Sequence, residues 1–218
     1  MRFLGENSGR PRWQRIALAW ALVLAPFLLW GALAEDVWQR ESFRFDAPIL
    51  LWMHSHSNLW LDRVMLELSL VGGYTLLFVS GALFLFLLFR SQRHNAIFVA
   101  LCIGGVSALN LSAKMIFQRT RPDLWISLAP EPDYSFPSGH AMLSSAFVAM
   151  TLVLVWHATN SRARAGVWRI VSALVGVTFV VAVGVSRLYL GVHYPSDILA
   201  GWLASCAWIG LVRIVTSE

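Results

Sequence analysis

The chain has 218 residues, of which 57% are hydrophobic and only 13% are charged. This composition excludes an ordinary soluble globular protein and predicts a single compact membrane-embedded domain over residues 1–218. The net charge of +5 does not indicate nucleic-acid binding. The arginines are scattered through short connectors, and they form no basic stripe with interleaved aromatic side chains.

Six apolar stretches are long enough to cross a bilayer as helices, which takes about 20 residues. In chain order they are Ile16–Ala34, Leu68–Phe89, Ala96–Ala113, Gly139–Trp156, Trp168–Val185 and Ile198–Val215. We therefore expect an all-α integral membrane protein, built as a bundle of six transmembrane helices. The first stretch has an alternative interpretation as a signal peptide, because Arg12 and Arg15 precede it and small residues end it. Cleavage would leave five spans.

The segment from Glu35 to Asp62, between the first two stretches, is mixed and acidic. Its spaced aromatic and aliphatic residues predict a short interfacial helix that lies on the outer leaflet. His54 and His56 belong to this segment. Two histidines without a nearby carboxylate or thiolate make a weak ligand set for a metal, so we interpret them as surface residues.

Cys102 and Cys206 fall inside predicted spans, among leucine, isoleucine and alanine. We interpret both as small buried hydrophobic residues and not as a disulfide or a metal site. Most tryptophans lie near predicted helix ends, where an amphipathic ring prefers the headgroup layer of the membrane.

Basic residues are unequally divided between the two sides of the predicted bundle. One side carries ten arginines: Arg2, Arg10, Arg12, Arg15, Arg90, Arg93, Arg162, Arg164, Arg169 and Arg213. The other side carries seven cations: Arg40, Arg44, Arg63, Lys114, Arg119, Arg121 and Arg187. The positive-inside rule then places both termini in the cytoplasm. The three polar clusters described next face the exterior or the periplasm.

The first cluster follows the third stretch. Lys114, the only lysine of the chain, is separated by six residues from Arg121. Arginine offers a planar fork and lysine a mobile point charge, so the pair suits one phosphate group, and Pro122 predicts the end of the helix that carries both. Snorkelling toward lipid headgroups is the alternative use of such cations. Asn110, one turn before Lys114, either orients it or satisfies a neighbouring helix.

The second cluster is Pro137-Ser138-Gly139-His140, at the start of the fourth stretch. Pro137 suits the first turn of a helix, and Ser138 and Gly139 then place a hydroxyl and unobstructed N–H groups at the helix N-terminus. Such a terminus binds anions readily. His140 can offer a proton to a leaving oxygen near neutral pH.

The third cluster begins with Arg187 at the end of the fifth stretch. Gly191 frees the turn, and Pro195 starts the next helix, which places His193 just before that helix and Asp197 in its first turn. An aspartate bound to one imidazole nitrogen fixes the tautomer and leaves the other nitrogen free to attack. Asp197 also suits a purely structural role as a partner of the helix N-terminus.

A metal site is the alternative use of His140 and His193. The further ligands within reach of them would be Asp123, Glu131 and Asp133, which belong to a loop. Arginine, lysine and a helix terminus already supply the positive charge that a metal would bring. We therefore expect no metal.

Together the clusters resemble the three signature motifs of the type 2 phosphatidic acid phosphatase (PAP2) family, without a departure at any signature position. The motifs cover residues 114–197, and the six-helix layout extends the similarity to most of the chain. The resemblance implies a bacterial membrane lipid phosphatase that needs no metal or other cofactor. In it His193 attacks phosphorus to form a phosphohistidine, Asp197 supports His193, and His140 protonates the leaving group. The residues that would hold the phosphate oxygens are Lys114, Arg121, Ser138, Gly139 and Arg187.

The resemblance also implies a lipid phosphate as the substrate. The short loops are most similar to those of the undecaprenyl diphosphate group, which predicts hydrolysis of undecaprenyl diphosphate to undecaprenyl phosphate at the outer side of the bacterial cytoplasmic membrane. Phosphatidylglycerophosphate and phosphatidate are alternative substrates, and a lipid phosphotransferase would use the same pocket with an alcohol in place of water. The alternative outside enzymology is a phospholipid-binding or transport protein, which would need neither a nucleophile nor an acid.

Overall fold

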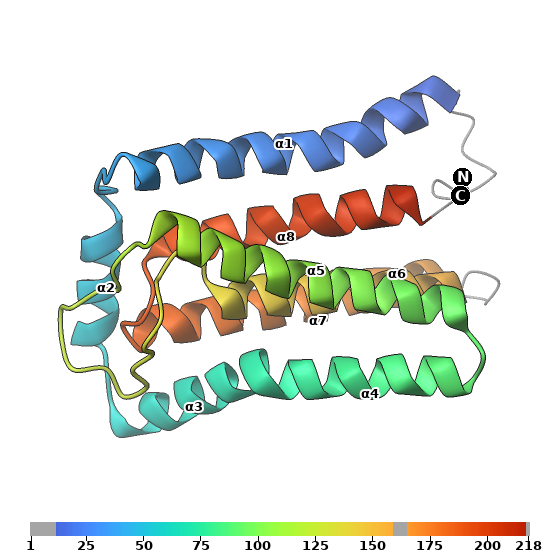
Figure 1. The fold of residues 1–218 in the computed structure, drawn as a ribbon. Helices are drawn as coiled ribbons and strands as arrows, with labels where there is room; N and C mark the ends of the chain where they lie inside the picture. The colour runs from blue at the N-terminus through green and yellow to red at the C-terminus, as the bar shows by residue number, and fades with distance from the viewer. Residues whose placement is uncertain (1–11, 159–164, 217–218) are drawn as a thin grey trace.

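The computed structural model describes residues 12–158 and 165–216, and these residues form helices, turns and loops without a strand. The helical elements are α1 (Arg12–Trp38), α2 (Asp46–Ser55), α3 (Leu59–Leu70), the π-helical turn η1 (Val71–Thr75), α4 (Leu76–Phe89), α5 (Arg93–Phe117), α6 (Gly139–Ala158), α7 (Ala165–Tyr189) and α8 (Pro195–Val215). The long helices run alongside one another as a bundle (Figure 1). The predicted all-α class is confirmed.

Within the described part of the chain, five helical stretches are long and apolar enough to cross a membrane. They are Leu59–Phe89, Arg93–Phe117, Gly139–Trp156, Gly166–Tyr189 and Pro195–Val215. Each contains one of the last five predicted spans, so the protein is a multi-pass membrane protein. The predicted span Ile16–Ala34 lies within α1 but is not among the five, and its crossing of the membrane stays a prediction.

The orientation of the termini also stays a prediction. Of the ten arginines on the side assigned to the cytoplasm, Arg2, Arg10, Arg162 and Arg164 lie outside the described residues. The start of α1 and the end of α8 lie at the same end of the bundle (Figure 1). α1 packs along α8.

The second span begins at Leu59 and not at Leu68, because η1 joins α3 and α4 into one continuous stretch. Gly73 has non-helical backbone angles within this turn (φ −108°, ψ −107°). A π-helical turn with two glycines is a common place for a helix to bend. A Cβ on Gly72 would collide with Val183 of α7, and one on Gly73 would lie 2.5 Å from Nε2 of His140. The glycines therefore let this helix approach α6 and α7 closely.

The short helix expected between the first two spans is α2, which lies across the ends of the long helices (Figure 1). Asp46 and Leu50 are four residues apart, so they share one face of α2, and both are buried. Leu50 belongs to a cluster with Leu188 and Ile198, at the ends of α7 and α8. Trp52 is exposed. One face of α2 is thus docked on the bundle, and an aromatic side chain is left at the surface.

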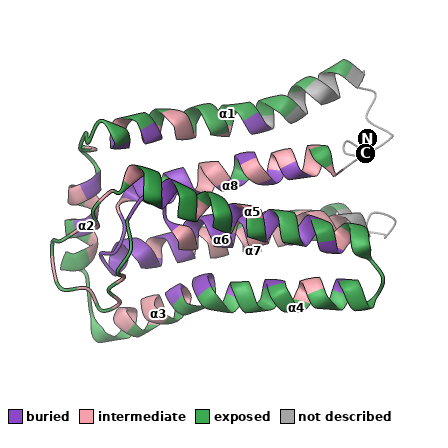
Figure 2. Ribbon diagram, in the orientation of Figure 1, coloured by how far each residue is buried: buried purple, intermediate pink, exposed green. Residues whose placement is uncertain are grey.

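α6 occupies the centre of the bundle and packs against α5, α7, α8 and η1. Its buried side chains Met142, Ala146 and Met150 form the main apolar core with α4, α5 and α8. The outward sides of the helices are largely exposed (Figure 2). They carry large apolar side chains such as Phe78 and Phe89. Such a surface would be unfavourable in water and suits contact with lipid.

The two cysteines are free, and their environments differ. Cys102 is buried as expected, but Cys206 is exposed, so the prediction that it is buried is wrong. A membrane helix is apolar on all sides, because one side faces lipid and the other faces protein. Hydrophobic neighbours along the sequence therefore do not distinguish the inner face of α8 from its outer face.

Substitution of Gly191 by alanine should lower the stability of the fold. Gly191 has φ +68°, and a Cβ there would lie 2.5 Å from the indole ring of Trp125. Left-handed backbone strain and the displaced ring together should cost about 1 to 3 kcal/mol. Thermal unfolding in detergent measures the loss. Gly81→Ala is the matched control, because a Cβ at this helical glycine meets nothing within 4 Å and alanine favours helix. Equal melting temperatures of the two variants would contradict the expectation.

Candidate active site

The ends of four helices and two loops bring all the predicted site residues into one region, at the α2 end of the bundle. Lys114 lies in the last turn of α5, Ser138, Gly139 and His140 at the start of α6, Arg187 in the last turn of α7, and Asp197 in the first turn of α8. Arg121 and His193 belong to the loops beside them. The backbone N–H of Ser138 donates to the carbonyl of Asp197 (3.2 Å). The starts of α6 and α8 are thereby joined directly.

Two local expectations from the sequence are corrected by the structure. Lys114 and Arg121 do not share a helix, because α5 ends at Phe117 and Gln118 adopts a left-handed conformation (φ 45°) as its C-cap. Arg121 is therefore carried by the following loop. Pro137 precedes α6, which begins at Gly139. The carbonyl of Pro137 accepts a hydrogen bond from Asn110 (2.9 Å), so Asn110 satisfies a neighbouring segment, one of its two expected roles.

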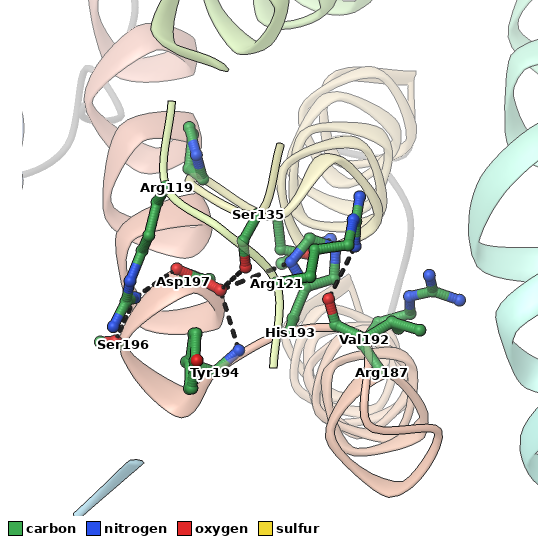
Figure 3. A network of polar contacts seen from close by, with 12 residues as sticks. Arg119, Arg121, Ser135, Arg187, Val192, His193, Tyr194, Ser196 and Asp197 are labelled. Carbon is green, nitrogen blue, oxygen red and sulfur yellow. Dashed lines mark hydrogen bonds and ion pairs between the residues drawn. The ribbon is translucent and has the colours of Figure 1, made fainter. Parts of the chain in front are cut away.

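The imidazole of His193 is held between an arginine and a carboxylate (Figure 3). Nη1 of Arg121 lies 3.1 Å from Nε2 of His193. Because a guanidinium can only donate, Nε2 must accept, and the ring hydrogen resides on Nδ1. Nδ1 faces Oδ2 of Asp197 at 3.6 Å, just beyond hydrogen-bond distance. The structure therefore presents Nε2 with a lone pair and places an anion behind the opposite nitrogen.

Burial keeps His193 neutral. Its side chain is fully buried, and burial, assisted by the positive charges of Arg121 and Arg187, lowers the pKa of His193 from 6.5 to about 4. Asp197 acts in the opposite direction but does not offset these effects. At neutral pH the imidazole is an uncharged base, which is the form that can act as a nucleophile.

Asp197 has three further partners, and the sequence did not indicate two of them. Oδ2 accepts hydrogen bonds from the hydroxyl of Ser135 and from the backbone N–H of Tyr194 (2.8 Å). Oδ1 accepts from Arg119 (2.5 Å). The bond to Tyr194 belongs to the capping role that was expected for an aspartate in the first turn. The contributions of Ser135 and Arg119 were missed, although Arg119 lies two residues before Arg121 and Ser135 two residues before Pro137.

Two loop carboxylates neutralise the cations of the site. Glu131 forms ion pairs with Arg187 and with Arg121 (2.6 Å), and Asp133 pairs with Lys114 and Arg121. Burial alone would raise the pKa of Glu131, but the positive charge of Arg187 and the neighbouring His193 and Arg121 lower it below its usual value. Both acids are therefore ionised at neutral pH. In the sequence, Glu131 and Asp133 lie between Arg121 of the first cluster and Pro137 of the second. This position was the signal that could have revealed their role.

Glu131 stands at the centre of this arrangement. Its carboxylate oxygens lie 3.8 Å from Nδ1 of His140 and 3.8 Å from Nε2 of His193. Arg187 is 1% exposed, and its Nε has no hydrogen-bond partner among the described residues. A buried donor without a partner is rare. The site therefore already contains the carboxylate of Glu131, and Nε of Arg187 can still donate to another oxygen.

A cavity of about 410 Å³ leads to this centre. Lys114, Glu131, Asp133 and His140 line its polar part. Its apolar part is lined by Tyr74, Leu77, Val106 and Leu143, from η1, α4, α5 and α6. Tyr74 and Leu77 are exposed on the outside of the bundle. The cavity therefore connects the outer surface of the bundle with His140, Lys114 and the two loop carboxylates.

The fold and this site define a class: multi-pass membrane proteins in which two histidines, cations and carboxylates gather among helix ends. The family model of the PAP2 superfamily matches residues 95–218, more than half of the chain. The chain belongs to the PAP2 superfamily. It is thus a membrane hydrolase of a family that includes lipid phosphatases.

Comparison with known proteins gives similar results for sequence and structure. The chain is 30% identical over 203 residues to an undecaprenyl-diphosphatase of Sulfolobus acidocaldarius, which covers 89% of each chain. It is 30% identical over 159 residues to phosphatidylglycerophosphatase B of Bacillus subtilis, which covers 71% of this chain and 74% of the relative. Its structure resembles the crystal structure of a transmembrane PAP2-type phosphatidylglycerolphosphate phosphatase from Bacillus subtilis. The TM-score is 0.77 at 25% identity, over 89% of this chain and 96% of that one.

The free energy of unfolding should decrease as the pH is lowered from about 6.5 to about 4. In this interval the unfolded chain binds a proton at His193 that the folded chain does not bind, because the pKa of His193 in the fold is about 4. This contribution to stability is complete above pH 6.5 and is lost as the pH approaches 4. Thermal unfolding in detergent, compared between the protein and His193→Gln, measures it. A variant that loses as much stability over this interval as the parent would contradict the assignment.

Proposed function

We propose that this protein is a metal-independent lipid phosphatase, formed by the whole chain as one domain, in which His193 becomes transiently phosphorylated. The observation that carries the proposal is the hydrogen bond from Arg121 to Nε2 of His193 (3.1 Å). Because the guanidinium donates, Nε2 must carry the lone pair of the neutral imidazole, and a phosphate that takes over the N–H of Arg121 would free this lone pair for attack. Asp197 lies behind the ring, where positive charge develops when Nε2 attacks.

The chemical steps follow from these positions. Nε2 of His193 attacks phosphorus, so the N–P bond forms while the bond from phosphorus to the leaving oxygen breaks, and His140 gives that oxygen a proton. The phosphorylated imidazole carries a positive charge, which the carboxylate of Asp197 balances. Water then gives a proton to His140 and attacks phosphorus. The new O–P bond replaces the N–P bond, inorganic phosphate is released, and His193 is neutral again.

Lys114, Arg121 and Arg187, with Ser138 and Gly139 at the start of α6, would hold the phosphate oxygens. The carboxylates of Glu131 and Asp133 already pair with the three cations, which supports these cations as anion ligands. The unpartnered Nε of Arg187 offers a further donor. On binding, the phosphate would displace Glu131 and take over its ion pairs.

The cavity supports a lipid as the substrate. It joins exposed apolar side chains of η1 and α4 to the polar centre, so a headgroup can reach His140 and Glu131 while its tail stays among the helices. Glu131 lies 3.8 Å from Nε2 of His193, so a phosphate that displaces it would lie beside the attacking nitrogen. Hydrolysis of undecaprenyl diphosphate to undecaprenyl phosphate is our first choice, and phosphatidylglycerophosphate and phosphatidate follow. The names of the two relatives support this order. We place the protein in a bacterial cytoplasmic membrane, with the site on the periplasmic or outer side.

Purified protein in detergent, with a chelator present, should release inorganic phosphate from at least one of three lipids: undecaprenyl diphosphate, phosphatidylglycerophosphate and phosphatidate. The His193→Ala variant should release none, because it lacks the attacking nitrogen. The fastest of the three identifies the substrate class. Full activity of His193→Ala would falsify the histidine mechanism. Absence of release from all three lipids by the parent protein would favour a phosphotransferase or a lipid-binding protein.

Glu131→Gln should make inorganic phosphate a stronger inhibitor of the lipid phosphatase reaction. The carboxylate competes with phosphate for Arg121 and Arg187, and the neutral amide competes less. A hydrogen bond to a charged group is worth about 1.5 to 3 kcal/mol, so the inhibition constant should fall by roughly tenfold or more. Asp123→Asn removes an exposed carboxylate from the same loop and serves as the control. An unchanged or higher inhibition constant in Glu131→Gln would show that Glu131 does not compete with phosphate.

A further inference from the structure

Arg119 stands two residues before Arg121, but it belongs to a different set of contacts. Its Nη1 donates to Oδ1 of Asp197 (2.5 Å) and to the hydroxyl of Ser196 (2.8 Å), as Figure 3 shows. Its Nη2 donates to Oδ2 of Asp46 (2.8 Å). The guanidinium therefore bridges a carboxylate of α8 and a carboxylate of α2.

Asp46 ties the first turn of α2 to the first turn of α8. Its Oδ1 accepts the backbone N–H of Ser196 (3.0 Å), and its Oδ2 accepts the hydroxyl of Ser196 (2.7 Å). A carboxylate in this position satisfies a free N–H at a helix N-terminus and is favoured by the helix dipole. Asp46 is 4% exposed. It is thus a buried anion with two specific partners, Ser196 and Arg119.

Aromatic rings enclose the guanidinium of Arg119. Its Cζ lies 4.2 Å from the ring centroid of Tyr194 and 5.6 Å from that of Phe43. Burial by itself would lower the pKa of Arg119, but the carboxylates of Asp197 and Asp46 more than offset this effect, so the pKa is raised. A cation between two carboxylates and two ring faces has little freedom to move.

Asp197 needs such a partner. Its side chain is fully buried, and a buried carboxylate without a matching cation takes up a proton or becomes very costly. Arg119 occupies Oδ1, which leaves Oδ2 directed toward Nδ1 of His193. Arg119 contacts Asp197, Ser196, Asp46 and the two rings, and none of these residues lines the cavity. Of these residues, Asp197 is the one that faces His193, so the direct route from Arg119 to the imidazole runs through Asp197.

We propose that Arg119 and Asp46 are positioning residues for phosphoryl transfer, which keep Asp197 ionised and aimed at His193. This inference rests on the proposed function, because it assigns a role behind the attacking imidazole. It gives α2 a part in the reaction. Asp46, the first residue of α2, does not line the cavity. It binds Arg119, and Arg119 in turn binds the carboxylate of Asp197.

The test compares Arg119→Gln, Asp46→Asn and the double variant, with undecaprenyl diphosphate as the substrate in detergent. Residues one step behind a functional histidine typically matter about 10- to 100-fold. We expect Arg119→Gln to lower kcat by that factor with KM changed by less than about threefold. Asp46→Asn should cause a smaller loss in the same direction. Because both act on one chain of contacts, the double variant should be no slower than Arg119→Gln within about threefold.

Two further measurements separate positioning from a structural role. Inhibition by inorganic phosphate should be unchanged in Arg119→Gln, because the anion ligands remain in place. Arg119→Lys should recover part of kcat, because it restores the charge beside Asp197 but cannot reach both carboxylates with one fork. Arg44→Gln, an exposed arginine next to α2, is the control and should leave kcat and the melting temperature unchanged.

The outcomes are distinct. Unchanged kcat in Arg119→Gln, or a loss confined to KM and to the binding of inorganic phosphate, would overturn the inference. A lower melting temperature with normal kcat for the folded fraction would also overturn it, since Arg119 would then be structural only. His193→Ala is measured in parallel. If that variant keeps full activity, the proposed function fails; if it is inactive while Arg119→Gln is fully active, only the positioning role fails.

Discussion

The structure depends on the neutralisation of buried positive charge at one end of an apolar bundle. Lys114 and Arg187 lie at helix ends and are nearly inaccessible to solvent, and an uncompensated ion in such a place costs several kcal/mol. The loop between α5 and α6 supplies the compensation through Glu131 and Asp133. A change in the fold of this loop would consequently also change the charge balance of the site. In the proposed reaction, an incoming phosphate would replace these carboxylates without leaving a cation unpaired.

Arg119 and Arg121 lie on opposite sides of the His193 imidazole, and each belongs to a different network of charged groups. Arg121 contacts Nε2 and pairs with Glu131 and Asp133 of the loop. Arg119 lies on the side of Nδ1, where it pairs with Asp197 and Asp46. The first network has one cation more than it has carboxylates, the second has one carboxylate more than it has cations, and the imidazole lies between them. In the proposed mechanism, this separation would let the anion beside Nε2 be exchanged while the charge beside Nδ1 stays fixed.

The sequence contained enough information to predict the motifs, because each pairs a special residue type with a helix end. Gly191, Pro195 and Asp197 fixed the turn before α8, and the positive φ and the helix start at Pro195 agree with that expectation. The partners of the motif residues could not be predicted in this way. Asp46 is 150 residues from Ser196 along the chain, and only the docking of α2 joins them. The early start of the second span was missed because α3 contains charged residues, and its continuation through η1 depends on packing of two glycines against α6 and α7.

The contact between η1 and His140 sets the shape of the cavity beside this imidazole. Gly73 lines this cavity, and its missing side chain leaves only main chain opposite the imidazole of His140. The width available to a leaving group at this point is thus determined by backbone atoms, which cannot rotate aside as a side chain can. If a lipid phosphate binds as proposed, this rigid backbone would limit the size of the group next to the scissile bond. Variation would be tolerated farther along the cavity, where Leu77 and Val106 line it.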